Sequence, residues 1–523
     1  MASPPVAENR KLVLVAMIFA VAMIFIDQTI VALAIPKIQS ELHVSPTESQ
    51  WVINGYLLSL SALFALGGRV ADVVGHRKVL LAGVIAFATF SAACGATPTG
   101  PAGAAWIITF RVLQGASAAF LFPAALAITV AAFPLHERGR ALAVFFSVSG
   151  GLTAIGPLAG GYLTQWTWRS IFWINVPVAI VAVVTTLRAK PRDEAHPGPI
   201  DGRGAALVCA GMALSVLGLQ QASTWGWNSA ATWGCIAVGI VLLIAFARFE
   251  LRVHDPLVPL RLFANRAFAV DNLVLFLLSI CFVPLFFFAS LYAQVALGET
   301  AQEAGLFLLV FFGGFTVGAQ IGGRVLDKRG ARPTVVMGCA LAAVGFYLWA
   351  ARLEDLSFSS QWFRLALAGV GVGMVLGPVS TDALNRSSSA TYGAVTGVTQ
   401  TVRNFGGSLG LAVLGSILIT QNTSRVSETL TRAGVPAARA HSVAHAISTS
   451  SGGASGSNVG PVHGAVAHHI ALDFALSTRT VIYLMAAVMA AAFLVAFLRM
   501  PRGQVQEQAP GPASSEPAVE PVA

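Results

Sequence analysis

Charged residues are scarce in this sequence. Only 11% of its 523 residues are charged, whereas 56% are hydrophobic, and the mean hydropathy is +0.74. Because a soluble domain carries about 25% charged residues, the composition excludes a soluble globular protein and indicates an integral membrane protein. The formal charge of +9 does not indicate nucleic-acid binding, since the basic residues form short clusters between apolar stretches rather than one basic face.

Cysteine and recognisable catalytic motifs are also scarce. The five cysteines lie in apolar stretches without CxxC spacing, so we expect neither a disulfide framework nor a metal site. The chain contains no GxxxxGK[ST] phosphate-binding motif, which argues against ATP as the direct energy source. It also lacks a nucleophile–base constellation of the kind that marks an enzyme. We therefore expect no enzymatic activity and no cofactor.

Long hydrophobic runs are abundant, and an apolar run of about 20 residues matches the hydrocarbon thickness of a bilayer. Lys and Arg concentrate in the loops on the side of the two termini, which predicts that both termini are cytoplasmic. The first run continues as a membrane span and does not resemble a cleavable signal. We predict an all-α membrane protein with fourteen helices over residues 12–35, 50–68, 79–97, 104–127, 140–163, 170–187, 204–222, 232–249, 267–292, 303–324, 333–351, 363–384, 394–420 and 478–498.

A loop motif, Gly-x3-Asp-x2-Gly-x-Arg, occurs twice on the predicted cytoplasmic side. The first copy contains Gly68, Asp72, Gly75 and Arg77, and the second contains Gly323, Asp327, Gly330 and Arg332. Transporters are commonly built from such repeats. We interpret the loops as an inner gate in which Asp72 and the basic residues can bond across the half when it closes on the cytoplasmic side. The alternative is a basic, glycine-rich hairpin with a purely topological role.

The repeat predicts the organisation of the chain. We expect a cytoplasmic N-terminus at 1–11, a six-helix half at 12–190, a two-helix insert with linkers at 191–260, a second six-helix half at 261–498 and a cytoplasmic tail at 499–523. The segment 421–477 is polar and rich in Ser, Gly and Ala, so we expect a long, solvated outer loop without fixed structure. Its histidines lack the spacing of a metal site. We also expect the Pro- and Glu-rich tail to be disordered.

One carboxylate stands alone in the first apolar stretch. Asp27 lies about eight residues, and Arg111 about seven, from the predicted outer ends of their stretches. At 1.5 Å per residue both lie roughly 10–12 Å below the outer surface, so they are placed to form an ion pair. Burial opposes the ionised acid and a nearby Arg favours it, which suits a proton carrier. A purely structural ion pair is the alternative.

Glycine and proline interrupt the stretch 140–163. Gly156, Pro157, Gly160 and Gly161 all fall within it. Proline kinks a helix, and glycines let a neighbouring helix pack close. We predict a helix that pivots between the two halves. An ordinary packing motif is the alternative.

Candidate substrate contacts are polar and aromatic residues of both halves. Aromatic rings can stack on apolar or cationic compounds, although phenylalanines in such stretches more often face lipid or other helices. Asp382 is a possible second ionisable site or an interfacial cap, and we expect Asp271 to sit at a helix start, where an acid favours the helix dipole. The predicted pocket residues are Gln28, Asn54, Tyr56, Gln114, Phe286 and Arg403.

Together these motifs resemble one family. Over residues 12–498 the chain is similar to the fourteen-helix drug:proton antiporters of the major facilitator superfamily. The matching motifs are Asp27-x-Thr29-Ile-Val, the loop 68–78, Arg111-x-x-Gln114-Gly115, Gly156-Pro157-x-x-Gly160-Gly161 and Trp168-Arg169-x-Ile-Phe-x-Ile-Asn175-Val-Pro177. The resemblance implies two six-helix halves plus two inserted helices, proton coupling by Asp27 and Arg111, and an inner gate at the repeated loop. One departure is His76, which stands where the family often has a basic residue.

The sequence therefore predicts a secondary transporter. We expect a monomer in the bacterial plasma membrane that exports hydrophobic or amphipathic drugs or antibiotics, including cationic ones, in exchange for protons. Its expected partners are the small-molecule substrate, protons and the lipid bilayer, without nucleic acid. A dedicated exporter of one endogenous metabolite, antibiotic or lipid is one alternative. A non-transporting membrane sensor is another.

Overall fold

The computed structural model describes residues 9–503 apart from residue 45, parts of 192–200 and 254–259, residues 387–391 and residues 451–463. Within these ranges the chain forms helices and no strand, as expected of a backbone that must satisfy its own hydrogen bonds in lipid. Thirteen described helices are long and apolar enough to cross a membrane, and α5 adds a further helix of 32 residues. Thirteen of the fourteen predicted stretches fall within one helix each, overrunning it by at most two residues, and the stretch 170–187 is divided between α6 and α7, so the predicted all-α membrane fold is confirmed.

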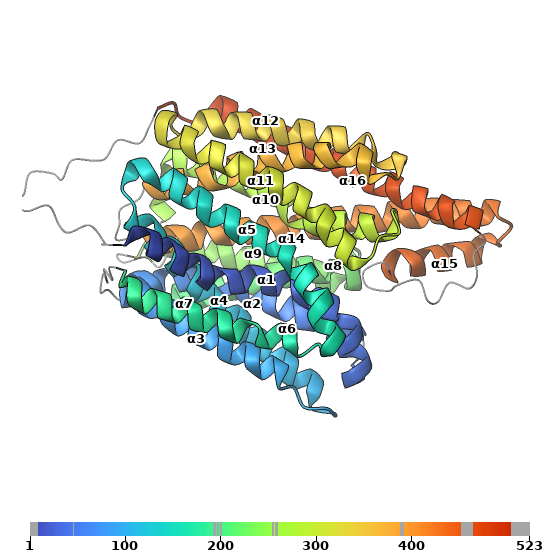
Figure 1. The fold of residues 1–523 in the computed structure, drawn as a ribbon, viewed down its shortest axis with the longest axis horizontal. Coiled ribbons are helices and arrows are strands. Elements are labelled where there is room, and N and C mark those ends of the chain that lie inside the picture. The colour runs from blue at the N-terminus through green and yellow to red at the C-terminus, as the bar shows by residue number, and fades with distance from the viewer. Residues whose placement is uncertain are drawn as a thin grey trace, which may run out of the picture.

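Helices α1–α7 form a first bundle (Figure 1). In it α1 packs against α4, α5 and α7, and α4 packs against α2 and α3. Glycines bring α2 and α4 into backbone contact, since a Cβ at Gly67 would lie 2.3 Å from the Ala119 carbonyl oxygen. The bounds are α1 Arg10–Leu42, α2 Pro46–Val74, α3 His76–Gly95, α4 Gly103–Ala132, α5 Leu135–Trp166, α6 Ser170–Trp173 and α7 Asn175–Ala189.

Helices α10–α14 and α16 form a second bundle, in which α13 packs against α11 and α12. Gly314 and Gly318 of α11 face Gly369 and Gly373 of α13, and a Cβ on any of them would lie 2.0–2.2 Å from a carbonyl oxygen of the facing helix. Two small-xxx-small motifs therefore set this close contact. The bounds are α10 Arg266–Val295, α11 Ala301–Arg329, α12 Ala331–Ala350, α13 Phe358–Asn385, α14 Tyr392–Arg432 and α16 Gly464–Arg499, with a short 3-10 helix, η2, at Leu353–Asp355.

Two further helices, α8 (Gly202–Trp225) and α9 (Ala230–Glu250), lie between the bundles in sequence. They pack against each other, and α8 also contacts α2 of the first bundle and α14 of the second. The short helix η1 (Leu260–Ala264) follows them. The inserted pair therefore touches both bundles through α8.

The start of α1 and the end of α16 lie at one end of the molecule, here named the terminal end (Figure 1, left). Helix α15 (Ala437–Ser450) lies at the opposite end, here named the α15 end (Figure 1, right). The segment 421–477 is largely helical, so the prediction of a solvated loop without fixed structure is wrong. It consists of the last part of α14, α15 and the first part of α16, while 451–463 lie outside the described residues.

An apolar stripe explains this helical hairpin. Val426 and Leu430 of α14 are buried with Ala440 and Ala444 of α15. Apolar residues four apart share one face of a helix, and alanine has the highest helix propensity. Asn422 adds a hydrogen bond by donating from Nδ2 to a hydroxyl oxygen of α15 at 2.9 Å. Burial of this stripe outweighs the polar composition from which the loop was predicted.

Candidate functional site

The Asp27 carboxylate is buried in the first bundle with 0% exposure. Arg111 Nη1 donates to its Oδ2 at 2.5 Å, and Gln114 Nε2 donates to its Oδ1 at 2.9 Å. Both donors come from α4, three residues apart and therefore on one face of that helix. The predicted pairing of Asp27 with Arg111 is present. Gln114, which the sequence placed in the pocket, completes it by giving the second carboxylate oxygen a donor.

Arg111 has further partners besides the carboxylate. Its Nε donates to the Val52 carbonyl oxygen at 2.8 Å, and its Nη1 also donates to Gln114 Oε1 at 2.8 Å. Its guanidinium carbon lies 4.3 Å from the centre of the Tyr56 ring, a cation–π distance. A proton on Asp27 would therefore not leave the buried guanidinium without acceptors. The Val52 and Gln114 oxygens thus satisfy the buried guanidinium in addition to the Asp27 carboxylate.

Helix α5 contacts α1 on both sides of Asp27. A Cβ at Gly156 would lie 2.0 Å from Thr29 Oγ1 and 3.2 Å from the Ile26 carbonyl oxygen. The first glycine of the Gly-Pro motif therefore lets α5 approach the part of α1 that carries the acid. Gly160 is also buried. Pro157 and Gly161 lie within α5, but their surroundings fall outside the described residues.

The duplicated loop has the same backbone shape in both copies. Gly75 separates α2 from α3 with φ 110°, and Gly330 separates α11 from α12 with φ 82°. Both values lie in the region that favours glycine, which is why each copy carries glycine here. Gly68 is buried in α2 one turn before the first loop's aspartate. The sequence repeat is therefore also a structural repeat at the terminal end.

Asp327 of the second copy joins the two bundles. Its Oδ1 accepts from the Gly139 backbone N–H at 2.9 Å and its Oδ2 from the Arg140 N–H at 3.1 Å, near the start of α5. A negative charge near a helix N-terminus is stabilised by the helix dipole. A Cβ at Gly323 would lie 2.5 Å from the Gly139 carbonyl oxygen, so α5 and α11 touch along their backbones.

Two more contacts connect the bundles. Arg138 Nη1 of α5 donates to Asn385 Oδ1 of α13 at 3.2 Å. A Cβ at Gly397 of α14 would lie 2.8 Å from the Phe64 carbonyl oxygen of α2. Both contacts lie in the halves of these helices that are nearer the terminal end. The two bundles are therefore in contact with each other at the terminal end.

Other residues of the repeat contact their own bundle. Asp72 is buried, and its Oδ1 lies 3.0 Å from His76 Nε2. His76, a departure from the family pattern, thus serves as a partner for the loop acid. Arg332 Nη2 donates to the Phe497 carbonyl oxygen of α16 at 2.7 Å, because the last carbonyls of a helix attract a cation. Arg332 thus bonds within the second bundle, and the interpretation of the repeated loop as an inner gate stays a prediction. Arg77 lies in the first turn of α3.

The predicted pocket residues fall into two groups. Tyr56 and Gln114 belong to the Asp27 site, and partly buried Gln28 and Asn54 lie on α1 and α2 of the same bundle. The second group lies in the second bundle. There the Phe286 and Phe282 ring centres are 4.8 Å apart, and the guanidinium carbon of buried Arg403 lies 5.8 Å from the Phe282 ring centre. Each bundle thus contributes aromatic rings beside an arginine.

Asp382 lies in a buried ion pair near the end of α13. Its Oδ2 accepts from Arg386 Nε at 2.8 Å, and the residue is 2% exposed. The same nitrogen lies 3.9 Å from Asp271 Oδ2. Helix α10 begins at Arg266, so Asp271 is past the first turn and fully buried, and the expectation that it only complements a helix start is wrong.

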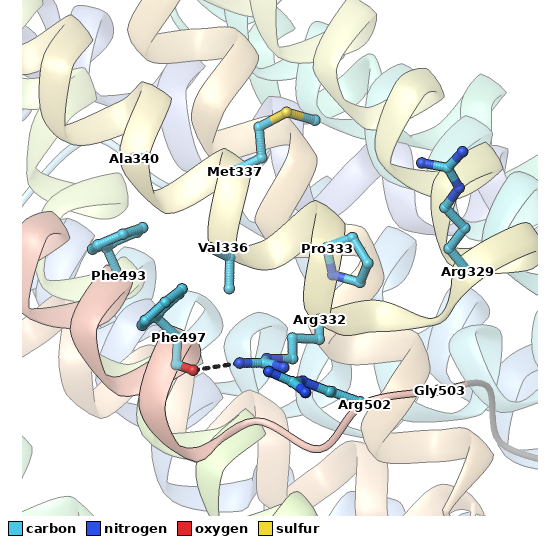
Figure 2. A pocket seen from close by; sticks show the side chains of 10 residues that line it. All are labelled: Arg329, Arg332, Pro333, Val336, Met337, Ala340, Phe493, Phe497, Arg502 and Gly503. Carbon is cyan, nitrogen blue, oxygen red and sulfur yellow. Dashed lines mark hydrogen bonds between the residues drawn. The ribbon is translucent and has the colours of Figure 1, made fainter.

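A cavity of about 480 Å³ lies elsewhere, between α12 and α16 at the terminal end (Figure 2). Apolar side chains such as Val336 and Phe493 line it, together with three arginines, one of which is Arg332. It contains none of the predicted pocket residues. This cavity is therefore separate from the Asp27 site.

Comparison with known proteins identifies what the chain is similar to. The model of the Major Facilitator Superfamily matches residues 17–411. The tetracenomycin C resistance and export protein of Streptomyces glaucescens is 33% identical over 81% of this chain and 78% of its own length. The puromycin resistance protein pur8 of Streptomyces alboniger is 34% identical over 77% of this chain and 81% of its own length. The solved structure of the proton:xylose symporter XylE shares the fold, with a TM-score of 0.60 and 12% identity over 95% of this chain and 97% of that one.

Proposed function

Because this chain belongs to the Major Facilitator Superfamily, we propose that it is a secondary transporter that exports a hydrophobic or amphipathic antibiotic or other drug in exchange for protons. Its family and fold are those of membrane transporters, which in general are not enzymes. The names of two relatives, one an antibiotic export protein and one an antibiotic resistance protein, support export of this class of compound. The proposal places a monomer in the bacterial plasma membrane, without a cofactor and with both termini in the cytoplasm.

The observation that carries the proposal is the buried group of Asp27, Arg111 and Gln114. In the cycle, a proton from outside neutralises Asp27 and weakens the link between α1 and α4. Arg111 then keeps the Val52 and Gln114 oxygens as acceptors. Each proton that moves inward releases about 2.3 kcal/mol per 100 mV of membrane potential, which can drive export.

The closed terminal end supplies the other half of the mechanism. In the proposal this end faces the cytoplasm, so the bonds from α5 to Asp327 hold the cytoplasmic side shut. Opening that side requires these bonds and the Arg138–Asn385 bond to break. Rocking of the two bundles would then expose the substrate and proton sites to one side at a time.

Transport into inverted membrane vesicles tests the proposal. An imposed pH gradient, acid inside, should drive uptake of a fluorescent antibiotic by the wild type, whereas Asp27→Asn should lose this dependence at equal expression. Glu428→Gln, which changes an exposed acid, serves as the matched control. Gradient-driven uptake that is undiminished in Asp27→Asn would exclude Asp27 as the coupling group.

A dedicated exporter of a single compound is the second candidate. It is supported by the printed names of two relatives, each of which refers to one antibiotic. A resistance panel in a pump-deficient bacterium distinguishes a dedicated exporter from a multidrug pump. Raised resistance to one chemical family alone indicates a dedicated exporter, and resistance to several unrelated families indicates a multidrug pump.

A further inference from the structure

Three charged side chains meet in the second bundle, apart from the Asp27 site. Asp382 and Arg386 come from the end of α13, and Asp271 comes from α10; together they are named the Asp271 cluster. Arg386 Nε lies 2.8 Å from Asp382 Oδ2 and 3.9 Å from Asp271 Oδ2. Asp271 is 0% and Asp382 2% exposed. One guanidinium therefore faces two buried carboxyl groups.

In the ranges that the structure describes, the Asp271 carboxyl group has no hydrogen-bond partner other than the neighbouring Asp382 carboxyl group. Both of its oxygens are buried without a donor among the described residues, while Arg386 gives its hydrogen bond to Asp382. Asp382 and Arg386 are the charged neighbours of the Asp271 carboxyl group. The other charged residues toward the terminal end of the elements packed against α10 are Arg261, Arg266, Arg324, Asp327, Lys328, Arg329, Arg403 and Arg499.

The charge balance requires a further positive charge. Two buried carboxylates that share one partly exposed guanidinium carry a net negative charge, and a buried unpaired carboxylate is costly enough that it takes up a proton instead. Two acids in one site do not both ionise. A metal cation is disfavoured because Arg386 already occupies the space beside both acids. We propose that Asp271 and Asp382 hold one proton between them and form a second proton-binding site.

The position of the cluster connects it to the closed end of the molecule. Asn385, the neighbour of Arg386 in sequence, accepts the hydrogen bond from Arg138 of the first bundle. Separation of the bundles would therefore pull on the end of α13 that carries Arg386. A change in the Arg386 contacts would then bind or release the shared proton on the terminal-end side. The release of this proton during transport rests on the proposed function, whereas the presence of a shared proton in the cluster does not.

Infrared spectroscopy tests the shared proton without any transport step. The full-length protein in lipid nanodiscs at neutral pH is compared with Asp27→Asn, Asp271→Asn and Asp382→Asn, and Glu428→Gln is the control for an exposed acid. A protonated carboxyl group has a C=O stretching band that an ionised one lacks. We expect this band in the wild type, in Asp27→Asn and in the control. It should be lost, by one carboxyl group per chain, in both Asp271→Asn and Asp382→Asn, because a single remaining carboxylate pairs with Arg386 and needs no proton.

Three results would overturn the shared proton. The band is absent from the wild type, it disappears only in Asp27→Asn, or it survives in Asp382→Asn, which would mean a lone desolvated acid at position 271. Gel filtration shows whether each variant folds. If Asp271→Asn does not fold, the spectrum of Asp382→Asn alone still decides whether the two acids share a proton. A failed transport assay leaves this measurement unaffected, so the two proposals fail separately.

Discussion

At the scale of single residues, two acids of α1 differ in what surrounds them. Asp27 is sealed inside the bundle, whereas the Glu41 side chain is 50% exposed at the α15 end. Burial raises the pKa of Glu41, but hydrogen bonds from Trp168 and Arg169 and the Arg169 charge together lower it below its ordinary value of 4.5. Glu41 thus ties the end of α1 to the start of α6 in its ionised form.

The Glu41 contacts predict a pH-dependent contribution to stability. Because the pKa in the folded state lies below the unfolded value, the ionised acid stabilises the fold above pH 4.5, and this contribution is lost as the pH falls through the folded pKa. We expect Glu41→Gln to lower the Tm at pH 7 and to differ less from the wild type in acid. Thermal unfolding in detergent at several pH values measures this.

Glu428→Gln is the control for that series, since its ion pair with Arg432 lies on an exposed helix surface and contributes little. Its Tm should follow the wild type at every pH. A Glu41→Gln deficit that is equally large at pH 7 and in strong acid would contradict the linkage.

Residue spacing alone predicted the Asp27–Arg111 pair, because depth in a membrane is proportional to distance along a helix. The Val52 carbonyl could not be predicted, since every residue carries the same backbone acceptor. The Asp271 cluster was missed because Arg386 is four residues from Asp382 but far in sequence from Asp271. Only the packing of α10 against α13 brings these groups together.

At the scale of elements, apolar runs predicted each membrane helix, because length and hydropathy decide what crosses a bilayer. They did not predict the hairpin of α14, α15 and α16. Val426 and Leu430 form a stripe of only two large residues within polar sequence, and it becomes significant only when Ala440 and Ala444 cover it. Helix contacts set by glycine were partly predictable, as Gly156 shows.

The contact of α5 with α1 gives a packing prediction. Gly156→Ala places a methyl group 2.0 Å from Thr29 Oγ1 beside the Asp27 site, so we expect a loss of about 1–3 kcal/mol in stability and reduced transport. Gly151→Ala on the same helix is the matched control, because its Cβ meets nothing within 4 Å. It should be neutral or stabilising by about 0.5–1 kcal/mol. Unfolding in detergent and vesicle uptake measure both variants, and equal behaviour of the two would contradict this account of the motif.

At the scale of the whole molecule, two bundles meet at the terminal end through α5, α11 and α13. These contacts combine polar bonds and close glycine approaches with buried apolar side chains, such as Phe146 of α5 and Leu376 of α13, that belong to one apolar core shared by both bundles. Helix α8 contacts both bundles through α2 and α14, so relative rotation of the bundles would have to move at least one of these contacts.

The closed end predicts the effect of Asp327→Asn. Loss of a negative charge at the start of α5 removes about 0.3–2 kcal/mol of stabilisation, so the open population should rise between about two-fold and thirty-fold. Distances between spin labels at His136 and Arg329 measure the opening. Glu299→Gln, which changes a partly exposed acid outside this contact, is the control. An unchanged distance distribution in Asp327→Asn would mean that this carboxylate does not hold the end closed.

Substrate-driven proton movement tests the central claim most directly. In proteoliposomes without an imposed pH gradient, substrate flowing down its own gradient should carry protons in the opposite direction, detected by a pH-sensitive dye. The account predicts this proton signal for the wild type and its absence in Asp27→Asn, which should still exchange labelled for unlabelled substrate. A proton signal of wild-type size in Asp27→Asn, or none in a wild type that moves substrate, would contradict it.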